Sequence, residues 1–178
     1  MTTKQKDTTK KTKRKNSNKI GAKFENRIEK HCEELDKKGI MKIHKIPSDF
    51  VLIRRGKQII SAYPKAKSKF CDMLGCLSDG RCVSFELKTH GNKTSFSFNN
   101  IQPYQIKYQK DIVDRYNCLA YYIIEWREFK RVFLIPALIM SDWIENLGRK
   151  SVPLSVMEKT EGVVELDYNK LNFEDYIK

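Results

Sequence analysis

The spacing of apolar residues changes along the chain, and each spacing predicts a different element. Between residues 20 and 35 the apolar positions recur every three or four residues, at Ile20, Phe24, Ile28, Cys32 and Leu35. This spacing is typical of an amphipathic helix, with Asn18 as a plausible N-cap and Gly39 as its stop. Residues 40–46 then alternate between apolar and polar, which predicts a strand that Pro47 ends.

Two apolar-rich runs in the middle of the chain predict a β-hairpin. Residues 70–77 and 81–88 are joined by a turn that contains Asp79-Gly80, the strongest short-range hairpin signal. Folding the second run back on the first brings Asp72 and Glu86 to the same end of the ribbon. Glu86 and Lys88 are two residues apart, so they project from one face of the strand while Leu87 points to the other.

The second half of the chain alternates between predicted helices and strands. Residues 89–100 are polar with alternating Ser and Phe and are expected to be a loop, after which Asn100 can cap a helix over 101–116. Further elements are two strands at 119–125 and 132–135, a helix that Pro136 opens, and a last helix near 169–177. This order predicts an α/β fold with a central mixed β-sheet flanked by helices.

Length and hydropathy favour one globular domain. The chain has 178 residues, of which 40% are hydrophobic, and we expect a single domain over 18–178. No apolar run reaches membrane-spanning length, and the N-terminal segment lacks the apolar core of a secretory signal. We therefore expect a cytoplasmic protein without a membrane partner.

The charge of the chain predicts a polyanionic partner. The first twenty residues carry eight Lys or Arg and one acid, which gives them +7 and leaves +6 of the total of +13 for the rest. Residues 1–17 are almost without apolar side chains, which predicts a basic tail that is disordered until it meets DNA. A role in solubility alone would explain the positive charge of the tail but not the positive net charge of the remaining residues. Nucleic acid is therefore the favoured partner.

A basic segment at about 49–69 interrupts the predicted strands and is interpreted as a stalk-like excursion. Its cations could meet converging DNA phosphates, although a solvated loop would explain any one of them. They are Arg54, Arg55, Lys57, Lys65 and Lys67.

Two carboxylates and an ammonium that converge on one spot are typical of a magnesium-dependent phosphodiester hydrolase. Mg²⁺ prefers one or two carboxylates while it keeps several waters. Asp72 and Glu86 would supply that pair, with the backbone carbonyl of Leu87 as a possible third ligand. Lys88 could hold the scissile phosphate, orient the attacking water or lower its pKa. The alternative is an ordinary solvated pair of charges on an exposed strand.

With its flanking segments, the sequence resembles the RecU-type Holliday junction resolvases, a branch of the PD-(D/E)xK nuclease superfamily. The resemblance runs from about Gly21 to the C-terminus. Asp72 and Gln105 are part of this resemblance. The other segments that carry it occur in the same order as in the family, at 21–25, 43–47, 62–63, 85–89, 92–96, 100–101 and 148–152.

The resemblance implies a restriction-endonuclease-like core and a homodimer that nicks four-way DNA junctions symmetrically, in a bacterial cell or a phage-infected host. It implies Mg²⁺, with Mn²⁺ as a substitute, and it makes Asp72 and Glu86 metal ligands and Lys88 the catalytic lysine. Glu25 would be the acid of the first helix, with Glu29 as its rival, and Gln105 would lie near the phosphate. Further DNA contacts are assigned to Lys93, Arg149 and Lys150.

Two departures from the family pattern and two rival functions remain. Cys71 stands where proline would precede Asp72, and the stalk-like segment is shorter than in typical relatives, which puts junction selectivity in question more than cleavage. One rival is a restriction-like or repair endonuclease of the same superfamily that acts on duplex or flapped DNA. The other is a non-catalytic protein that binds DNA junctions.

Overall fold

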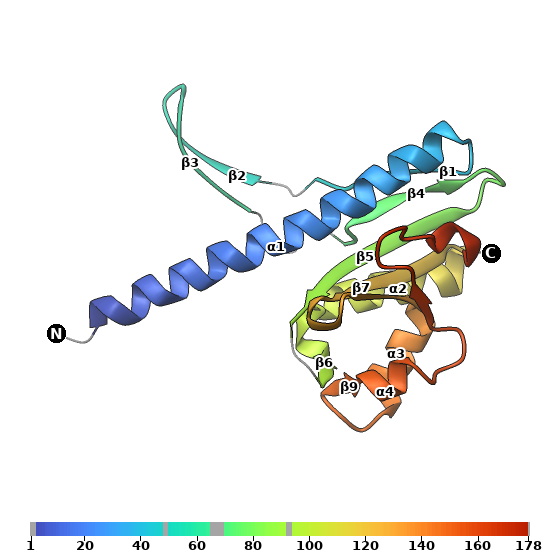
Figure 1. Cartoon of the computed structure of the whole chain (residues 1–178). Coiled ribbons are helices and arrows are strands. Elements are labelled where there is room, and N and C mark those ends of the chain that lie inside the picture. The colour runs from blue at the N-terminus through green and yellow to red at the C-terminus, as the bar shows by residue number, and fades with distance from the viewer. Residues whose placement is uncertain (1–2, 48–49, 65–69, 92–93, 178) are drawn as a thin grey trace.

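A six-stranded mixed sheet forms the centre of the molecule in a computed structural model that describes residues 3–47, 50–64, 70–91 and 94–177 (Figure 1). Among the described strands of this sheet, β5 and β7 are the one parallel pair, and the other neighbours are antiparallel. The strands, in sheet order, are β1 (Met41–Lys45), β4 (Met73–Leu77), β5 (Cys82–His90), β7 (Leu119–Trp126), β8 (Arg131–Pro136) and β10 (Val164–Leu166).

Helices cover both faces of this sheet, as the sequence predicts for an α/β fold. On one face α1 (Thr3–Lys37) packs against the side chains of β5 that include Phe85 and Leu87. On the other face α2 (Pro103–Tyr116) and α3 (Ala137–Asn146) pack against Tyr122 and Ile124 of β7. Among the described residues, no helix is both long enough and apolar enough to cross a bilayer.

The first helix is longer than predicted. Its apolar side chains Phe24, Ile28 and Leu35 are buried as expected, and Gly39 follows its end with a positive φ of 70°. The structure nevertheless continues α1 back to Thr3, so the helix begins before Asn18. This stretch contains neither glycine nor proline, so nothing in it breaks a helix that is anchored further along.

The predicted hairpin is formed by β4 and β5, and it aligns the charged residues. Met73 pairs with Phe85, which places Asp72 beside Glu86 at the start of β4. Gly75 allows β1 to approach β4 closely, because a Cβ there would collide with the backbone oxygen of Lys42. The turn at Asp79-Gly80 has its glycine at a φ of 88°.

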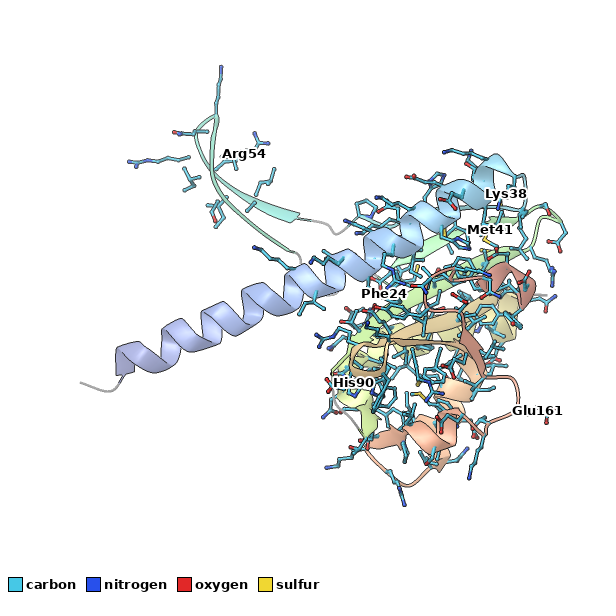
Figure 2. The ribbon with its side chains drawn as sticks, in the orientation of Figure 1. Phe24, Lys38, Met41, Arg54, His90 and Glu161 are labelled. Atoms are coloured by element: carbon cyan, nitrogen blue, oxygen red, sulfur yellow. The ribbon has the colours of Figure 1, made fainter. Side chains whose placement is uncertain are left out.

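The basic excursion folds as a hairpin of its own. β2 (Phe50–Arg55) and β3 (Gln58–Pro64) pair with each other and form no part of the central sheet. Figures 1 and 2 show this hairpin projecting away from the sheet, with Arg54 on it.

The predicted loop at 89–100 is wrong in part. β5 extends to His90, and β6 (Ser95–Ser97) pairs with β9 (Ser151–Pro153) and buries Phe96. The alternation of Ser and Phe is therefore the period of a short strand. A 3₁₀ turn, η1 (Phe98–Asn100), follows it. Asn100 does not cap α2: Gln102 is the N-cap, and its backbone N–H donates to Oε1 of Gln105 at 3.1 Å.

The end of the chain also differs from the prediction. The expected helix near 169–177 is only a 3₁₀ turn, η3 (Phe173–Asp175), although Phe173 and Ile177 are buried against the face that α1 covers. Strand β8 includes Pro136, which is the N-cap of α3 rather than its first residue. Two remaining short elements are η2 (Arg127–Phe129) and α4 (Leu154–Met157).

Candidate active site

The two predicted metal-binding carboxylates meet on the face of the sheet that α2 covers. Backbone hydrogen bonds fix the position of Asp72 from both sides, because its N–H donates to Phe85 and its carbonyl accepts from Ile46. The Oδ2 atom of Asp72 accepts the N–H of Leu87 at 2.8 Å. Asp72 is 8% exposed and Glu86 is fully buried. The hairpin therefore presents both carboxylates to one shielded spot.

Glu86 is also the centre of a hydrogen-bonded cluster. Its Oε1 accepts from Nζ of Lys88 and from Nε2 of Gln105, each at 2.6 Å. Nζ of Lys88 also lies 3.4 Å from Oε1 of Gln105. Gln105 reaches Glu86 because it stands in the first turn of α2, on the face of the helix that packs on the sheet. Four of the five predicted catalytic residues are thus brought together.

The charge state of Glu86 reflects this crowding. Burial, and then repulsion by Asp72, raise the pKa of Glu86 from 4.5 to about 8, while Lys88 partly offsets the shift. Its Oε2 atom is buried and has no hydrogen-bond partner among the described residues. A cation next to this oxygen would remove both the repulsion and the unsatisfied acceptor.

The donor set fits a hard divalent cation. Within the described residues no group of three or more His, Cys, Asp or Glu side chains could hold a metal, which leaves a site with two carboxylates. Mg²⁺ is commonly bound by one or two carboxylates, because it keeps several of its waters. The N–H of Leu87 points to Asp72. The N–H and C=O of one residue point to the same neighbouring strand, so the Leu87 carbonyl faces the same side.

Glu25 makes its ion pair with a residue outside this cluster. Its carboxylate pairs with Nζ of Lys45 at 2.7 Å, and Lys45 stands opposite Met73 in the ladder between β1 and β4. The predicted acid of the first helix is therefore bound to β1, the strand that pairs with β4.

A model of the family described as RecU, recombination protein U, matches residues 19–178. The chain belongs to the RecU family. The Holliday junction resolvase RecU of Pediococcus pentosaceus is 31% identical over 142 residues, which cover 75% of this chain and 69% of that protein. The RecU resolvase of a Geobacillus species is 29% identical over 139 residues, which cover 73% and 68%.

Among solved structures, the chain is similar to Hjc of Archaeoglobus fulgidus, a Holliday junction resolvase from an archaeal hyperthermophile. That match has a TM-score of 0.40 and 12% identity, and it covers 85% of this chain and 91% of the other. Resolvases of the RecU family generally depend on a divalent metal ion, which agrees with the carboxylate pair that Asp72 and Glu86 form.

Five of the residues that the sequence assigns to DNA contacts are described by the structure, on two exposed segments. Arg54, Arg55 and Lys57 are exposed on the projecting hairpin of β2 and β3 (Figure 2). Arg149 and Lys150 are exposed between α3 and β9, and the carbonyl of Lys150 accepts the N–H of Phe98. The remaining three, Lys65, Lys67 and Lys93, lie outside the described residues.

The sequence gives no signal for one residue that the structure places beside the cluster. Tyr122 stands opposite Glu86 in the ladder between β5 and β7 and is fully buried. Its hydroxyl has no hydrogen-bond partner among the described residues. Burial and the neighbouring Glu86 raise the pKa of Tyr122, so the hydroxyl stays protonated. Within an apolar strand, a tyrosine is indistinguishable from an ordinary core residue.

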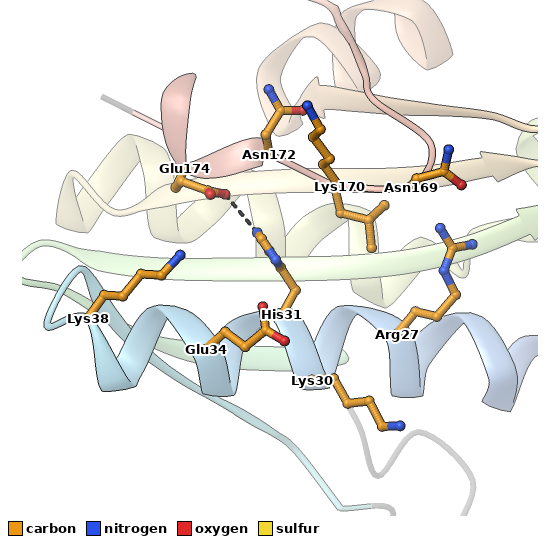
Figure 3. Close-up of a pocket in the computed structure, with 10 residues that line it drawn as sticks. Arg27, Lys30, His31, Glu34, Lys38, Asn169, Lys170, Asn172 and Glu174 are labelled. Carbon is orange, nitrogen blue, oxygen red and sulfur yellow. Dashed lines mark hydrogen bonds and ion pairs between the residues drawn. The ribbon is translucent and has the colours of Figure 1, made fainter.

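A pocket lies on the α1 face of the sheet, opposite to the face that carries the carboxylates. It is bounded by α1 and the end of the chain and has a volume of about 460 Å³ (Figure 3). His31 of α1 bonds Oε2 of Glu174 across it at 2.8 Å. Lys30, Lys38 and Lys170 share the lining with Glu34 and Glu174, so its charge is mixed. This pocket belongs to the docking of the C-terminal segment on α1 and is separate from the carboxylates.

Proposed function

We propose that this protein is a structure-selective endodeoxyribonuclease that resolves four-way (Holliday) DNA junctions by paired symmetric nicks, in recombination and repair. The observation that carries the proposal is the cluster of Asp72, Glu86, Lys88 and Gln105 in a member of the RecU family. Each of these side chains suits phosphodiester hydrolysis, and together they form one shielded site on the sheet.

Asp72 and Glu86, with the carbonyl of Leu87, would hold Mg²⁺, and Mn²⁺ would substitute for it. The bound ion would supply Lewis-acid stabilisation of the phosphate charge and a more acidic water. Oε2 of Glu86 is the oxygen left for this role, because its Oε1 accepts from Lys88 and Gln105. The ammonium of Lys88 would orient the attacking water or stabilise the charge that develops on the phosphate.

Gln105 would hold Glu86 in position, because its side-chain amide donates to Glu86 while its carbonyl oxygen accepts from Gln102. Glu25 would act from the neighbouring position, through the ion pair that fixes Lys45 beside β4. These two residues would thus support the residues that touch the phosphate.

A four-way junction suits the distribution of charge. The exposed cations Arg54, Arg55 and Lys57 project on the hairpin of β2 and β3, and the predicted contacts of Lys65, Lys67, Lys93, Arg149 and Lys150 would add to them. A homodimer has a physical rationale, because resolution needs nicks in two opposed strands and a two-fold axis presents two equivalent sites.

Comparison of two substrates tests this function. We expect the protein with Mg²⁺ to nick a synthetic four-way junction symmetrically at its branch and to leave a linear duplex of the same sequence uncut. Cutting of the linear duplex, or of a flapped duplex in preference to the junction, would instead indicate a restriction-like or repair endonuclease. Tight junction binding without cleavage in Mg²⁺ or Mn²⁺ would indicate a non-catalytic binding protein.

A further inference from the structure

A pocket lies between α2 and the residues that precede β4, and none of the proposed metal ligands lines it. It has a volume of about 360 Å³, which is within the range of about 300–1,000 Å³ that is typical of small-ligand sites. We call it the aromatic pocket; it is lined by Phe70, Tyr104, Lys107, Tyr108 and Asp111. Phe70 precedes Asp72 by two residues and Tyr104 precedes Gln105 by one, so the two segments that line the pocket also carry two residues of the cluster.

Aromatic rings dominate the lining of this pocket. The ring centroids of Phe70 and Tyr108 lie 4.6 Å apart, and their planes are inclined by 39°. Phe70 is 41% exposed although it is a large apolar side chain. Aromatic rings at the edge of a nucleic-acid site are platforms on which unpaired bases stack.

The polar groups of the aromatic pocket suit a nucleotide. Lys107 is exposed on α2, where its ammonium can neutralise a backbone phosphate. The carboxylate of Asp111 bonds Arg115 at 2.8 Å through one oxygen and can accept an amino group of a base through the other. Burial raises the pKa of Tyr108 to about 12, so its phenol remains a neutral donor.

We propose that the aromatic pocket binds one unstacked DNA base beside the phosphate that is cut. The proposal rests on the proposed nuclease function, and it assigns to Phe70 and Tyr108 a part in selecting the cleavage position. A base is favoured over other occupants because the segments that line the pocket also carry Asp72 and Gln105, and because the pocket pairs aromatic faces with a cation. Unstacking costs least where base pairing is already interrupted, as at a branch point.

Substitution of Phe70, combined with removal of single bases, tests this proposal. The substrates are four-way junctions that carry one abasic nucleotide, placed in turn at each position near the scissile phosphate. Phe70→Ala is expected to slow single-turnover cleavage of the intact junction by about tenfold or more, as the loss of one base–aromatic stack predicts. At one position of the abasic nucleotide, the wild-type protein should cleave the junction as slowly as Phe70→Ala cleaves the intact junction. On that abasic junction, Phe70→Ala should cleave no more slowly than the wild type.

Phe129→Ala is the matched control, because Phe129 is 43% exposed and lies on the turn between β7 and β8; it should cleave like the wild type. The proposal is overturned if Phe70→Ala slows every junction by the same factor, or slows none. It is also overturned if sedimentation shows that Phe70→Ala dissociates a dimer, since a second copy would then occupy the pocket. Failure of the wild-type protein to cut any junction would overturn the nuclease function itself, and the pocket assignment with it.

Discussion

Nζ of Lys88 lies 2.6 Å from Oε1 of Glu86, two residues earlier on the same strand. The side-chain amide of Gln105 donates to the same oxygen, so that oxygen is fully engaged while Oε2 is buried without a partner among the described residues. Glu86 therefore has one oxygen held by the protein and one that is left for the proposed metal.

The raised pKa of Glu86 predicts how the stability of the metal-free protein depends on pH. Burial and Asp72 raise this pKa from 4.5 to about 8, so between these values the folded protein keeps a proton that the unfolded chain has released. The free energy of unfolding should therefore fall as pH rises from about 4.5 through about 8. Urea unfolding in EDTA at a series of pH values measures this slope.

Glu86→Gln removes the titrating group, so its slope over this pH window should be smaller than that of the wild type. Added divalent cation should stabilise the wild type most at high pH, because the metal binds the deprotonated carboxylate. Identical slopes for the variant and the wild type would show that Glu86 does not titrate there.

Tyr122→Phe should separate stability from activity. The hydroxyl is buried beside Glu86 and has no hydrogen-bond partner among the described residues, so its removal should raise the free energy of unfolding by about 1 kcal/mol. With Glu86 deprotonated on the metal, this hydroxyl would be a hydrogen-bond donor next to a metal ligand and would help to orient it, so cleavage without it should slow by about tenfold. Thermal unfolding and single-turnover cleavage measure the two effects.

Tyr121→Phe is the matched control for this change, since Tyr121 is the preceding residue of β7 and packs with the cluster on the α1 face. It should cleave junctions at the wild-type rate. If Tyr122→Phe instead unfolds more easily and cleaves normally, the hydroxyl is an ordinary part of the core.

Gly75→Ala tests the close approach of β1 and β4 that supports Asp72. A Cβ at this position would collide with the backbone of Lys42 and Ile43, so the variant should lose about 1–3 kcal/mol in urea unfolding. Gly21→Ala is its counterpart, because a Cβ there meets nothing within 4 Å, and in a helix it should stabilise by about 0.5–1 kcal/mol. Equal stability of Gly75→Ala and the wild type would contradict this packing.

The parts of the site that are encoded locally could be predicted from the sequence. The Asp79-Gly80 turn fixes the register that brings Asp72 beside Glu86, and the period of a strand puts Lys88 on the same face. The contact of Gln105 with Glu86 could be anticipated only through the family resemblance, because it depends on how α2 packs on the sheet. Tyr122 had no local signal, since its position depends on a parallel strand pair with a long connection.

Elements that depend on distant partners were predicted less well. Strand β6 pairs with β9, far along the chain, so its short alternation of Ser and Phe could be taken for a loop. The aromatic pocket likewise joins Phe70 to α2 across a large separation in sequence. Apolar periodicity reports which face of an element is buried, but it does not report which distant element covers that face.

Single-turnover cleavage of a four-way junction by Asp72→Asn and Glu86→Gln tests the central claim most directly. Each change keeps the shape of the side chain and removes the charge that would hold a divalent ion. We predict that both variants bind the junction as the wild type does and lose Mg²⁺-dependent cleavage by at least a hundredfold, on the order expected for loss of a metal ligand. Full cleavage by both variants would contradict the assignment of these carboxylates as the active site.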